Sequence, residues 1–298
     1  MPSSPMNISI LVSLCLFSIL PIIAQASVPP SARFQYVNEG EFGDYVVEYD
    51  GSYRVLSPFA QPFQLCFYNT TPNEFTLAVR MGTVRSEGLM RWVWEANRGN
   101  PVGEKATLTF GKDGNLVLAH ADGRIAWQTN TANKGVVGFE LLSNGNMVLY
   151  DSKRRFVWQS FNSPTDTLLV GQSLKLGGVN KLVSRASQKV NKNGRYSLVL
   201  EPNTVSMYNT SSKSQKPRRY FSFSKLIGEH QGYLGHMTFN GDLSLGFNGK
   251  KVPLSTQSFN TTLSYLRLGV DGNLRIYTYV YDNDPDAGRA WVVTYTLL

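Results

Sequence analysis

Three stretches of the chain share a nine-residue pattern in which a turn rich in Gly, Asp and Asn leads into a short apolar strand. They read GKDGNLVLA at residues 111–119, LSNGNMVLY at 142–150 and GVDGNLRIY at 269–277. In an extended strand alternate side chains share a face, so Asp113, Asn115 and Val117 point the same way in the first copy. Three such neighbours span roughly 13 Å, enough to place a carboxylate, an amide and an apolar patch beneath one sugar ring. The pattern therefore indicates carbohydrate recognition.

The corresponding side chains of the other two copies complete the set of candidate sugar contacts. They are Asn146, Val148 and Tyr150 in the second copy, and Asp271, Asn273 and Tyr277 in the third. Asp-Gly-Asn and Asn-Gly-Asn are also good turn sequences, because their side chains bond to the local backbone. The sequence leaves both roles open.

Groups suited to catalysis are few. The three histidines, His120, His230 and His236, lack metal-ligand spacing, and the sequence contains no GxSxG elbow, phosphate-binding loop or CxxC pair. We therefore expect no enzymatic activity, no metal and no cofactor.

The net charge of +8 comes from short basic clusters at residues 153–155, 213–219 and 250–251. Outside the cell, the acidic partner for such clusters would be an anionic polysaccharide rather than a nucleic acid. The clusters also flank turn residues, as solvated loop tips do. The sequence alone does not choose between a polyanion site and solvated loops.

Residues 1–26 carry no charged side chain, are mostly apolar from residue 8 to residue 23, and end in the small-residue sequence AQA. We expect a secretory signal peptide cleaved after Ala26. The missing basic n-region leaves a signal anchor as the alternative, but the apolar run is shorter than the 18 or so residues of a spanning helix. No later segment is long and apolar enough to span a membrane, so we expect a secreted protein.

Cleavage would remove Cys15 and leave Cys66 as the single cysteine. We expect a buried, inert thiol there rather than an intermolecular bridge, because its neighbours are apolar. Export would make three sequons usable for N-glycosylation, at Asn69, Asn209 and Asn260.

Gly, Asn and Asp interrupt runs of four to seven β-branched, aromatic and aliphatic residues along the whole chain, which predicts an all-β protein of short strands. Asp122-Gly123 favours a tight hairpin turn. Trp94, Trp127 and Trp158 recur at spacings of 33 and 31 residues, once in each repeated unit. Such units must bury their apolar faces against one another, so we expect a three-faced prism with the three indoles meeting inside.

Two tandem domains of this kind account for the chain. We expect a signal peptide at 1–26, a first domain at 27–170, a Gly-rich linker at 171–181 and a second, degenerate domain at 182–298.

Two longer motifs then give a family resemblance. WVWEANRGNP at residues 92–101 and WQSFNSPTDTLL at 158–169 resemble two segments, in the same order, of plant bulb-type (G-type) lectins from the branch of S-locus glycoproteins and lectin receptor kinases. Within that branch the chain is most similar to the soluble, secreted epidermal glycoproteins that lack a kinase. The resemblance implies the β-prism II fold, an extracellular location in the cell wall or apoplast, and glycan or cell-wall polysaccharide partners; it leaves a homodimer open.

The resemblance also implies a mannose site of the form QxDxNxVxY, and no copy here is complete. All three lack the leading Gln, the first has Ala119 in place of Tyr, the second has Asn144 in place of Asp, and the third has Arg275 in place of Val. Losing two sugar hydrogen bonds costs roughly 1 to 3 kcal/mol. We therefore expect weak or multivalent binding of mannose-type or cell-wall glycans, with a structural or protein-interaction role and vestigial sugar sites as the alternative.

Soluble members of this group commonly continue into a cysteine-rich module. The sequence given ends at Leu298 without such a module. We expect either a truncated form or a shortened relative.

Overall fold

The computed structural model describes residues 27–82, 90–211, 216–228, 233–255, 263–279 and 291–298. The expected signal peptide, Asn260 and His230 lie outside these residues. Within them the chain folds into short antiparallel strands, with one α-helical turn, α1 (Ser224–Ile227), and three 3-10 turns, η1 (Pro30–Ala32), η2 (Glu48–Asp50) and η3 (Ser160–Asn162). The all-β prediction is confirmed.

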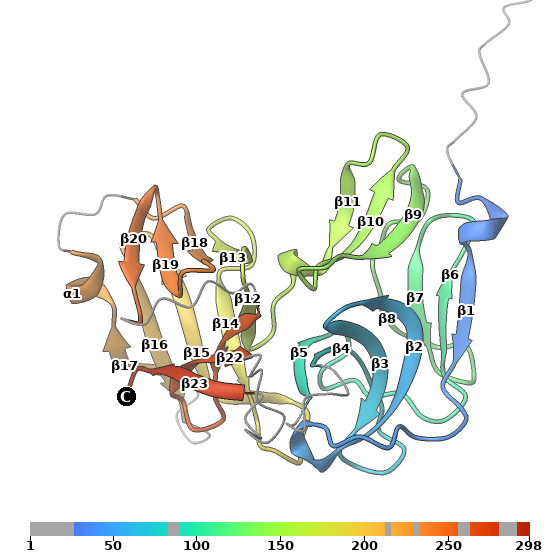
Figure 1. Ribbon diagram of the computed structural model, residues 1–298, viewed down its shortest axis with the longest axis horizontal. Coiled ribbons are helices and arrows are strands. Elements are labelled where there is room, and N and C mark those ends of the chain that lie inside the picture. Colours follow the sequence, from blue (N-terminus) through green and yellow to red (C-terminus); the bar gives the residue numbers. More distant parts are fainter. Residues whose placement is uncertain (1–26, 83–89, 212–215, 229–232, 256–262, 280–290) are drawn as a thin grey trace, which may run out of the picture.

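Three sheets make up the N-terminal half, in the blue-to-green part of Figure 1. Their strand orders are β1-β6-β7-β8, β2-β3-β4-β5 and β11-β10-β9. The strands are β1 (Phe34–Val37), β2 (Ser52–Ala60), β3 (Phe63–Asn69), β4 (Thr76–Met81), β5 (Arg91–Glu95), β6 (Thr107–Phe110), β7 (Leu116–Ala119), β8 (Ile125–Gln128), β9 (Val136–Leu141), β10 (Met147–Asp151) and β11 (Phe156–Gln159).

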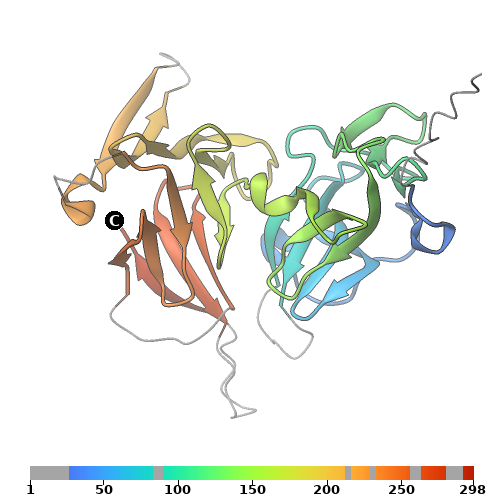
Figure 2. The ribbon, with the colours of Figure 1, turned by 90° about the horizontal axis from the view of Figure 1, so that it is seen from above.

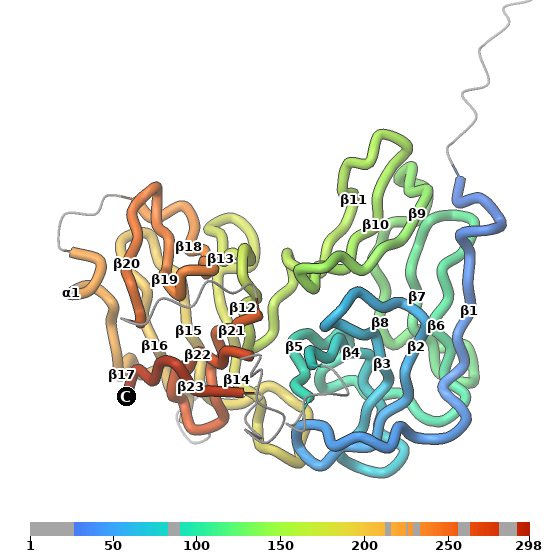
Figure 3. Tube along the Cα trace, viewed as in Figure 1, coloured from blue at the N-terminus to red at the C-terminus, as the bar shows by residue number. Residues whose placement is uncertain are grey.

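Three further sheets make up the C-terminal half, in the yellow-to-red part of the Cα trace in Figure 3. Their strand orders are β12-β21-β22-β23, β13-β18-β19-β20 and β14-β15-β16-β17. The strands are β12 (Thr167–Leu169), β13 (Ser173–Lys175), β14 (Lys181–Arg185), β15 (Asn193–Glu201), β16 (Thr204–Thr210), β17 (Pro217–Ser222), β18 (His236–Phe239), β19 (Ser244–Phe247), β20 (Lys250–Pro253), β21 (Ser264–Leu268), β22 (Leu274–Tyr279) and β23 (Trp291–Thr296).

Each half has its own apolar core, enclosed by its three sheets. Leu116 and Leu118 of β7 and Leu149 of β10 lie in the first core, and Leu266 and Ile276 lie in the second. Along β7, β10 and β22 these core residues alternate with the candidate sugar contacts, so the inner faces are apolar and the motif side chains stand on the outer faces.

The three tryptophans meet in the N-terminal half, as expected, with Trp94 buried and Trp127 and Trp158 half-buried against the core. Trp94 lies 5.9 Å from Trp127 and 6.2 Å from Trp158 between ring centroids, and Trp127 lies 5.8 Å from Trp158. All three pairs are edge-to-face, at interplanar angles of 73–76°. One indole from each sheet thus closes the prism, because edge-to-face packing places the positive edge of one ring against the negative face of the next.

The strand pairing differs from the expected linker. Residues 171–181 contain β13, which pairs with β18, and β12 already pairs with β21, although it lies within the expected first domain. Strand pairing satisfies the backbone N–H and C=O groups of this segment, which a free linker would leave to water. The expected division into domains stays a prediction, with the strands of the C-terminal half beginning at Thr167.

The halves pack side by side in both views (Figures 1 and 2). The outer face of sheet β2-β3-β4-β5 is covered and contributes to a small cluster of buried residues that includes Tyr53, Cys66, Tyr68 and Trp92. From the other half, Tyr265 joins the first core, and Tyr277 and Trp291 pack against it. The expected buried thiol is therefore confirmed, since Cys66 is 0% exposed and unpaired.

Candidate carbohydrate-binding site

The first copy of the repeat is built on a tight turn before β7. The Asp113 Oδ1 atom accepts a hydrogen bond of 3.1 Å from the backbone N–H of Asn115. Gly114 between them has φ +79°, and a Cβ there would lie 2.7 Å from the Cβ of Val136. The turn thus requires glycine for both its backbone angle and its packing.

The Asn115 side chain is used inside the protein. Its Nδ2 group donates to Gln128 Oε1 at 2.8 Å, and its Oδ1 atom accepts from the Thr129 hydroxyl at 3.0 Å and the Thr131 N–H at 3.1 Å. The residue is 6% exposed. Asn115 therefore fastens the end of β8 to the start of β7, and one of its two amide hydrogens is already committed.

The outer face around this copy is open. A row of paired residues crosses the sheet through Gln35, Thr109, Val117 and Gln128. Val117 is half-buried, while Asp113 and Gln35 are exposed. This face can offer a carboxylate, amides and a shallow apolar surface to a ligand.

The second copy repeats the same fastening. The backbone N–H of Asn146 donates to Asn144 Oδ1 at 3.1 Å, and its side chain donates to Gln159 Oε1 at 2.8 Å and accepts from the N–H of Phe161 at 3.2 Å. Unlike Val117, however, Val148 is only 1% exposed. A sugar ring could not pack on Val148 without displacing what covers it.

Tyr150 in the second copy is also occupied. Its ring lies so close over Gly138 that a Cβ at that position would come within 2.3 Å of Tyr150 Cζ. The Arg154 guanidinium stands 3.9 Å from the ring centroid and pairs with Glu140 at 2.6 Å. An internal cation thus shares the tyrosine face that a sugar would use.

The third copy fills its own polar site. Arg275 bonds both oxygens of Asp271, at 3.0 and 2.6 Å, and these side-chain hydrogen bonds lower the pKa of the Asp271 carboxyl. Asn273 accepts the Leu298 N–H at 3.0 Å and donates to the Leu298 carbonyl. The arginine that replaces the motif valine therefore holds the carboxylate that would bind a hydroxyl.

Tyr277 of the third copy faces the other half of the protein. Its ring stacks on Tyr265 at 5.1 Å, and the Arg91 guanidinium lies 5.2 Å from its centroid. The structure thus leaves the first copy as the most open of the three faces.

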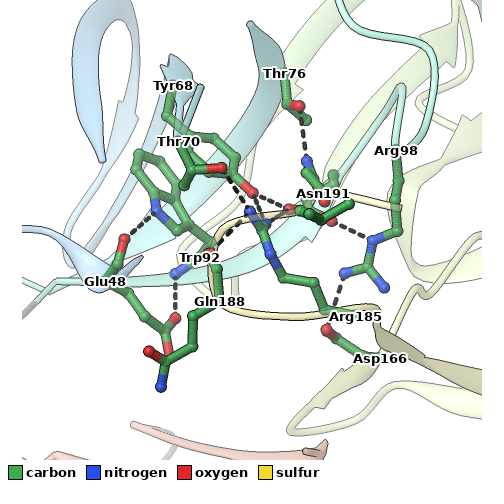
Figure 4. A network of polar contacts seen from close by, with 12 residues as sticks. Glu48, Tyr68, Thr70, Thr76, Trp92, Arg98, Asp166, Arg185, Gln188 and Asn191 are labelled. Carbon is green, nitrogen blue, oxygen red and sulfur yellow. Dashed lines mark hydrogen bonds and ion pairs between the residues drawn. The ribbon is translucent and has the colours of Figure 1, made fainter. Parts of the chain in front are cut away.

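The two long motifs contact each other at the junction of the halves (Figure 4). Arg98 bonds Asp166 at 2.9 Å and the Val183 carbonyl at 3.0 Å, and the Trp94 indole donates to the Ser163 carbonyl at 3.0 Å. Burial opposes ionisation of Asp166, but the guanidinium groups of Arg98 and Arg267 outweigh it and lower the pKa of this carboxyl. The two motifs that carry the family resemblance thus also dock the two halves, a role that their sequence does not predict because it depends on contacts with residues far along the chain.

Arg185 is the largest side chain at this junction that is almost fully buried. It is 1% exposed and bonds the Tyr68 hydroxyl at 2.6 Å, Thr70 Oγ1 at 2.9 Å and Glu95 Oε1 at 3.3 Å, as Figure 4 shows in part. A second ion pair joins Arg267 to Glu48 at 2.6 Å. Buried ions from both halves therefore form one connected network.

Two of the three sequons lie within the described residues. Asn69 is 8% exposed at the end of β3 and lines a pocket of about 450 Å³ with Phe42 and Glu104. Asn209 is half-buried in β16. Their occupancy stays a prediction.

Groups for other chemistry are sparse in the described part of the chain. No set of three His, Cys, Asp or Glu residues there could hold a metal ion. His120 has a buried Nε2 atom with no partner, and His236 is exposed. None of the described helices has the length and apolar character to cross a bilayer.

Comparison with known proteins agrees with the two motifs. Residues 91–189 match the family model described as D-mannose binding lectin. The chain is 54% identical over 287 residues to the epidermis-specific secreted glycoprotein EP1 of Daucus carota, covering 91% of this chain and 73% of that protein. It is 52% identical over 305 residues to EP1-like glycoprotein 3 of Arabidopsis thaliana, covering 98% and 68%.

Among solved structures, a Polygonatum cyrtonema lectin complexed with monomannoside is 26% identical over 37% of this chain and 78% of its own, with a TM-score of 0.17. The identity and coverage of the carrot and Arabidopsis proteins, together with the lectin model, decide the family. The chain belongs to the EP1-like secreted glycoproteins of the plant bulb-type lectin family.

Proposed function

We propose that this protein is a secreted, non-enzymatic glycoprotein of the plant cell wall or apoplast that binds mannose-type or related cell-wall glycans weakly. The main contact surface would be the outer face of sheet β1-β6-β7-β8, with Asp113 and Val117 as its centre. The observation that carries the proposal is the open polar row across this face, with Val117 half-buried between Thr109 and Gln128. Family membership supports the choice of a sugar as ligand.

The other candidate contacts differ in how much of the structure must move before they could reach a ligand. Asn115 would contribute its remaining amide hydrogen. Asn146, Val148 and Tyr150 would form a second face only after Arg154 moves from the Tyr150 ring. Asp271, Asn273 and Tyr277 would contact ligand only if the Arg275 pair and the junction of the halves opened, so this copy is the weakest candidate.

Val117→Glu tests the proposal without disturbing the bonds that Asn115 makes. The substitution places a charge on the apolar part of the face, where burial of about half a valine would be worth roughly 1 kcal/mol, or about fivefold in affinity per site. The matched control is Val190→Glu, because Val190 is 46% exposed in the other half. Both variants and the parent would be applied as multimers to an array of high-mannose and plant wall glycans.

We expect the array signal to fall for Val117→Glu and to persist for Val190→Glu, with both melting temperatures near that of the parent. Equal signals from all three proteins would overturn the assignment of this face. Asn115→Ala is a poorer probe, because it also removes the side-chain hydrogen bonds that hold the end of β8 to the start of β7.

A second candidate function is a structural or protein-interaction role with vestigial sugar faces. It is favoured by one observation: Asn115, Asn146 and Asn273 all bond to the neighbouring strand or chain end. This alternative expects Asn115→Ala to lower the melting temperature while retention on mannose-agarose and on wall polysaccharide is absent in both parent and variant. Elution of the parent by free sugar would exclude it.

A further inference from the structure

The three basic clusters of the sequence have different surroundings. Arg154 and Arg155 pair with Glu140 and Asp151, at 2.6 and 2.7 Å. Lys251 pairs with Asp242 at 2.7 Å. Two of the clusters therefore have part of their charge compensated by neighbouring carboxylates.

In the third cluster, residues 213–215 lie outside the described part of the chain, and the described cations are not compensated. Lys216, Arg218 and Arg219 are exposed, and none has a carboxylate within 4.0 Å in the part of the chain that the structure describes. Glu201, on the same sheet, is bonded instead to the hydroxyls of Ser206 and Tyr208. Three uncompensated cations close together raise the local concentration of anions.

These cations surround a hollow on the C-terminal half. A pocket of about 560 Å³ is lined by Lys216, Arg218, Arg219 and Tyr220, together with Asn209 and Ser211. Tyr220 is 38% exposed, and its hydroxyl is anchored to the Gly272 carbonyl. The pocket thus combines positive charge with a fixed aromatic ring.

The strand geometry explains how adjacent residues share one pocket. Arg219 pairs with Tyr208 and Phe221 pairs with Met207, so Tyr220 is an extra residue in β17. Such a bulge breaks the alternation that would send Arg219 and Tyr220 to opposite faces. β17 is also the edge of sheet β14-β15-β16-β17, and its residues 217–220 are exposed.

We propose that this pocket binds an acidic polysaccharide whose negative charge is carried by uronate carboxylates. Lys216 to Arg219 cover roughly 10 Å of extended chain, a length suited to neighbouring sugar units of one glycan. The two guanidinium groups would bond carboxylates, and the Tyr220 ring would pack against a sugar ring. This site is separate from the outer face around Val117 and does not depend on sugar binding there.

The test compares two double variants with the same loss of charge. Arg218→Ser/Arg219→Ser removes two of the three pocket cations and keeps Lys216, and Lys250→Ser/Lys251→Ser removes two cations from β20. Each protein would be tested both with the native sequon and with Ser211→Ala, so that the effect of an N-glycan on Asn209 is separated from the effect of the charges. Each would be passed over immobilised polygalacturonate, its fully methyl-esterified form, heparin and mannan, and eluted with a salt gradient.

We expect salt-dependent retention on polygalacturonate that the Arg218→Ser/Arg219→Ser variant weakens about 2- to 30-fold and the Lys250→Ser/Lys251→Ser variant leaves near the parent. Methyl esterification should abolish retention, because it neutralises the carboxylates. Equal losses in both double variants, retention on the esterified polymer, or retention on heparin alone would overturn the proposal. Mannan retention reports separately on the Val117 face, so failure of one site is distinguishable from failure of the other.

Discussion

Replacing Arg185 by Met tests whether buried ions hold the two halves together. Met keeps a long, apolar side chain in the site but removes the charge and every donor. The substitution removes the bonds to Tyr68, Thr70 and Glu95, and it also removes the guanidinium stacked 4.4 Å from the Tyr49 ring. Of the partners left behind, Tyr68 and Glu95 are buried, at 0% and 5% exposure.

Breaking a buried ion pair by removing one partner usually costs about 3 to 5 kcal/mol. Glu95 would keep its second cation, Arg98, so we expect the lower end of that range, about 3 kcal/mol. This corresponds to a drop of roughly 6 to 12 °C in the melting temperature. Because the network spans the junction, the loss should appear in one cooperative transition rather than in an early partial one.

Urea unfolding followed by tryptophan fluorescence would measure the change. Arg195→Met is the matched control, because Arg195 is exposed and bonds only the Tyr196 hydroxyl among the contacts described; we expect a change within about 0.5 kcal/mol. Glu95→Gln and the double variant complete a cycle in which the penalties should be non-additive by about 1 to 3 kcal/mol. An Arg185→Met protein within 1 kcal/mol of the parent, or strict additivity, would refute the reasoning.

Three further predictions concern the core, the thiol and the second copy. Trp127→Ala should lower the free energy of unfolding by about 3 kcal/mol in urea, because it opens a void between Trp94 and Trp158. Burial raises the pKa of the Cys66 thiol to about 12, so a thiol reagent at pH 8 should label the unfolded protein and leave the native one unmodified. Since the unfolded thiol ionises near its ordinary pKa of 9.0, this burial contributes stability below pH 9, and that stability should fall by roughly 1.4 kcal/mol per pH unit up to about pH 12 in alkaline titration. Leu142→Gln/Asn144→Asp combined with Arg154→Ser should strengthen mannose binding about 5- to 150-fold by calorimetry; no gain would contradict the motif assignment.

The prism and its centre could be predicted from the sequence because they depend on local signals. The Trp spacing, the Gly and Asn turns and the alternation within each copy are all short-range patterns, and the structure places them as expected. The turn role of the motif Asn residues was foreseen as an alternative. The sequence did not show which residues these Asn side chains bond. Their partners on the next strand, or at Leu298, follow from how the strands pair.

The covered faces could not be predicted in the same way. Whether an outer face is open depends on contacts between residues far apart in the sequence, such as Arg267 with Glu48. One signal was available: β3 is apolar on both faces, as FQLCFYN shows, which is typical of a strand buried on both sides. The occupation of Asp271 by Arg275 could also have been suspected, because the two side chains lie on the same strand face.

The docking of the two halves limits how the protein can gain avidity. One outer face of each half is buried at the junction. The faces of the first and second copies lie outside the junction, on the neighbouring sheets β1-β6-β7-β8 and β11-β10-β9 of the N-terminal half. Such faces look in different directions, so a flat layer of wall polymer would meet one of them at a time. Strong attachment to a surface would therefore require many copies of the protein, or a flexible glycan able to bend around the edge between two sheets.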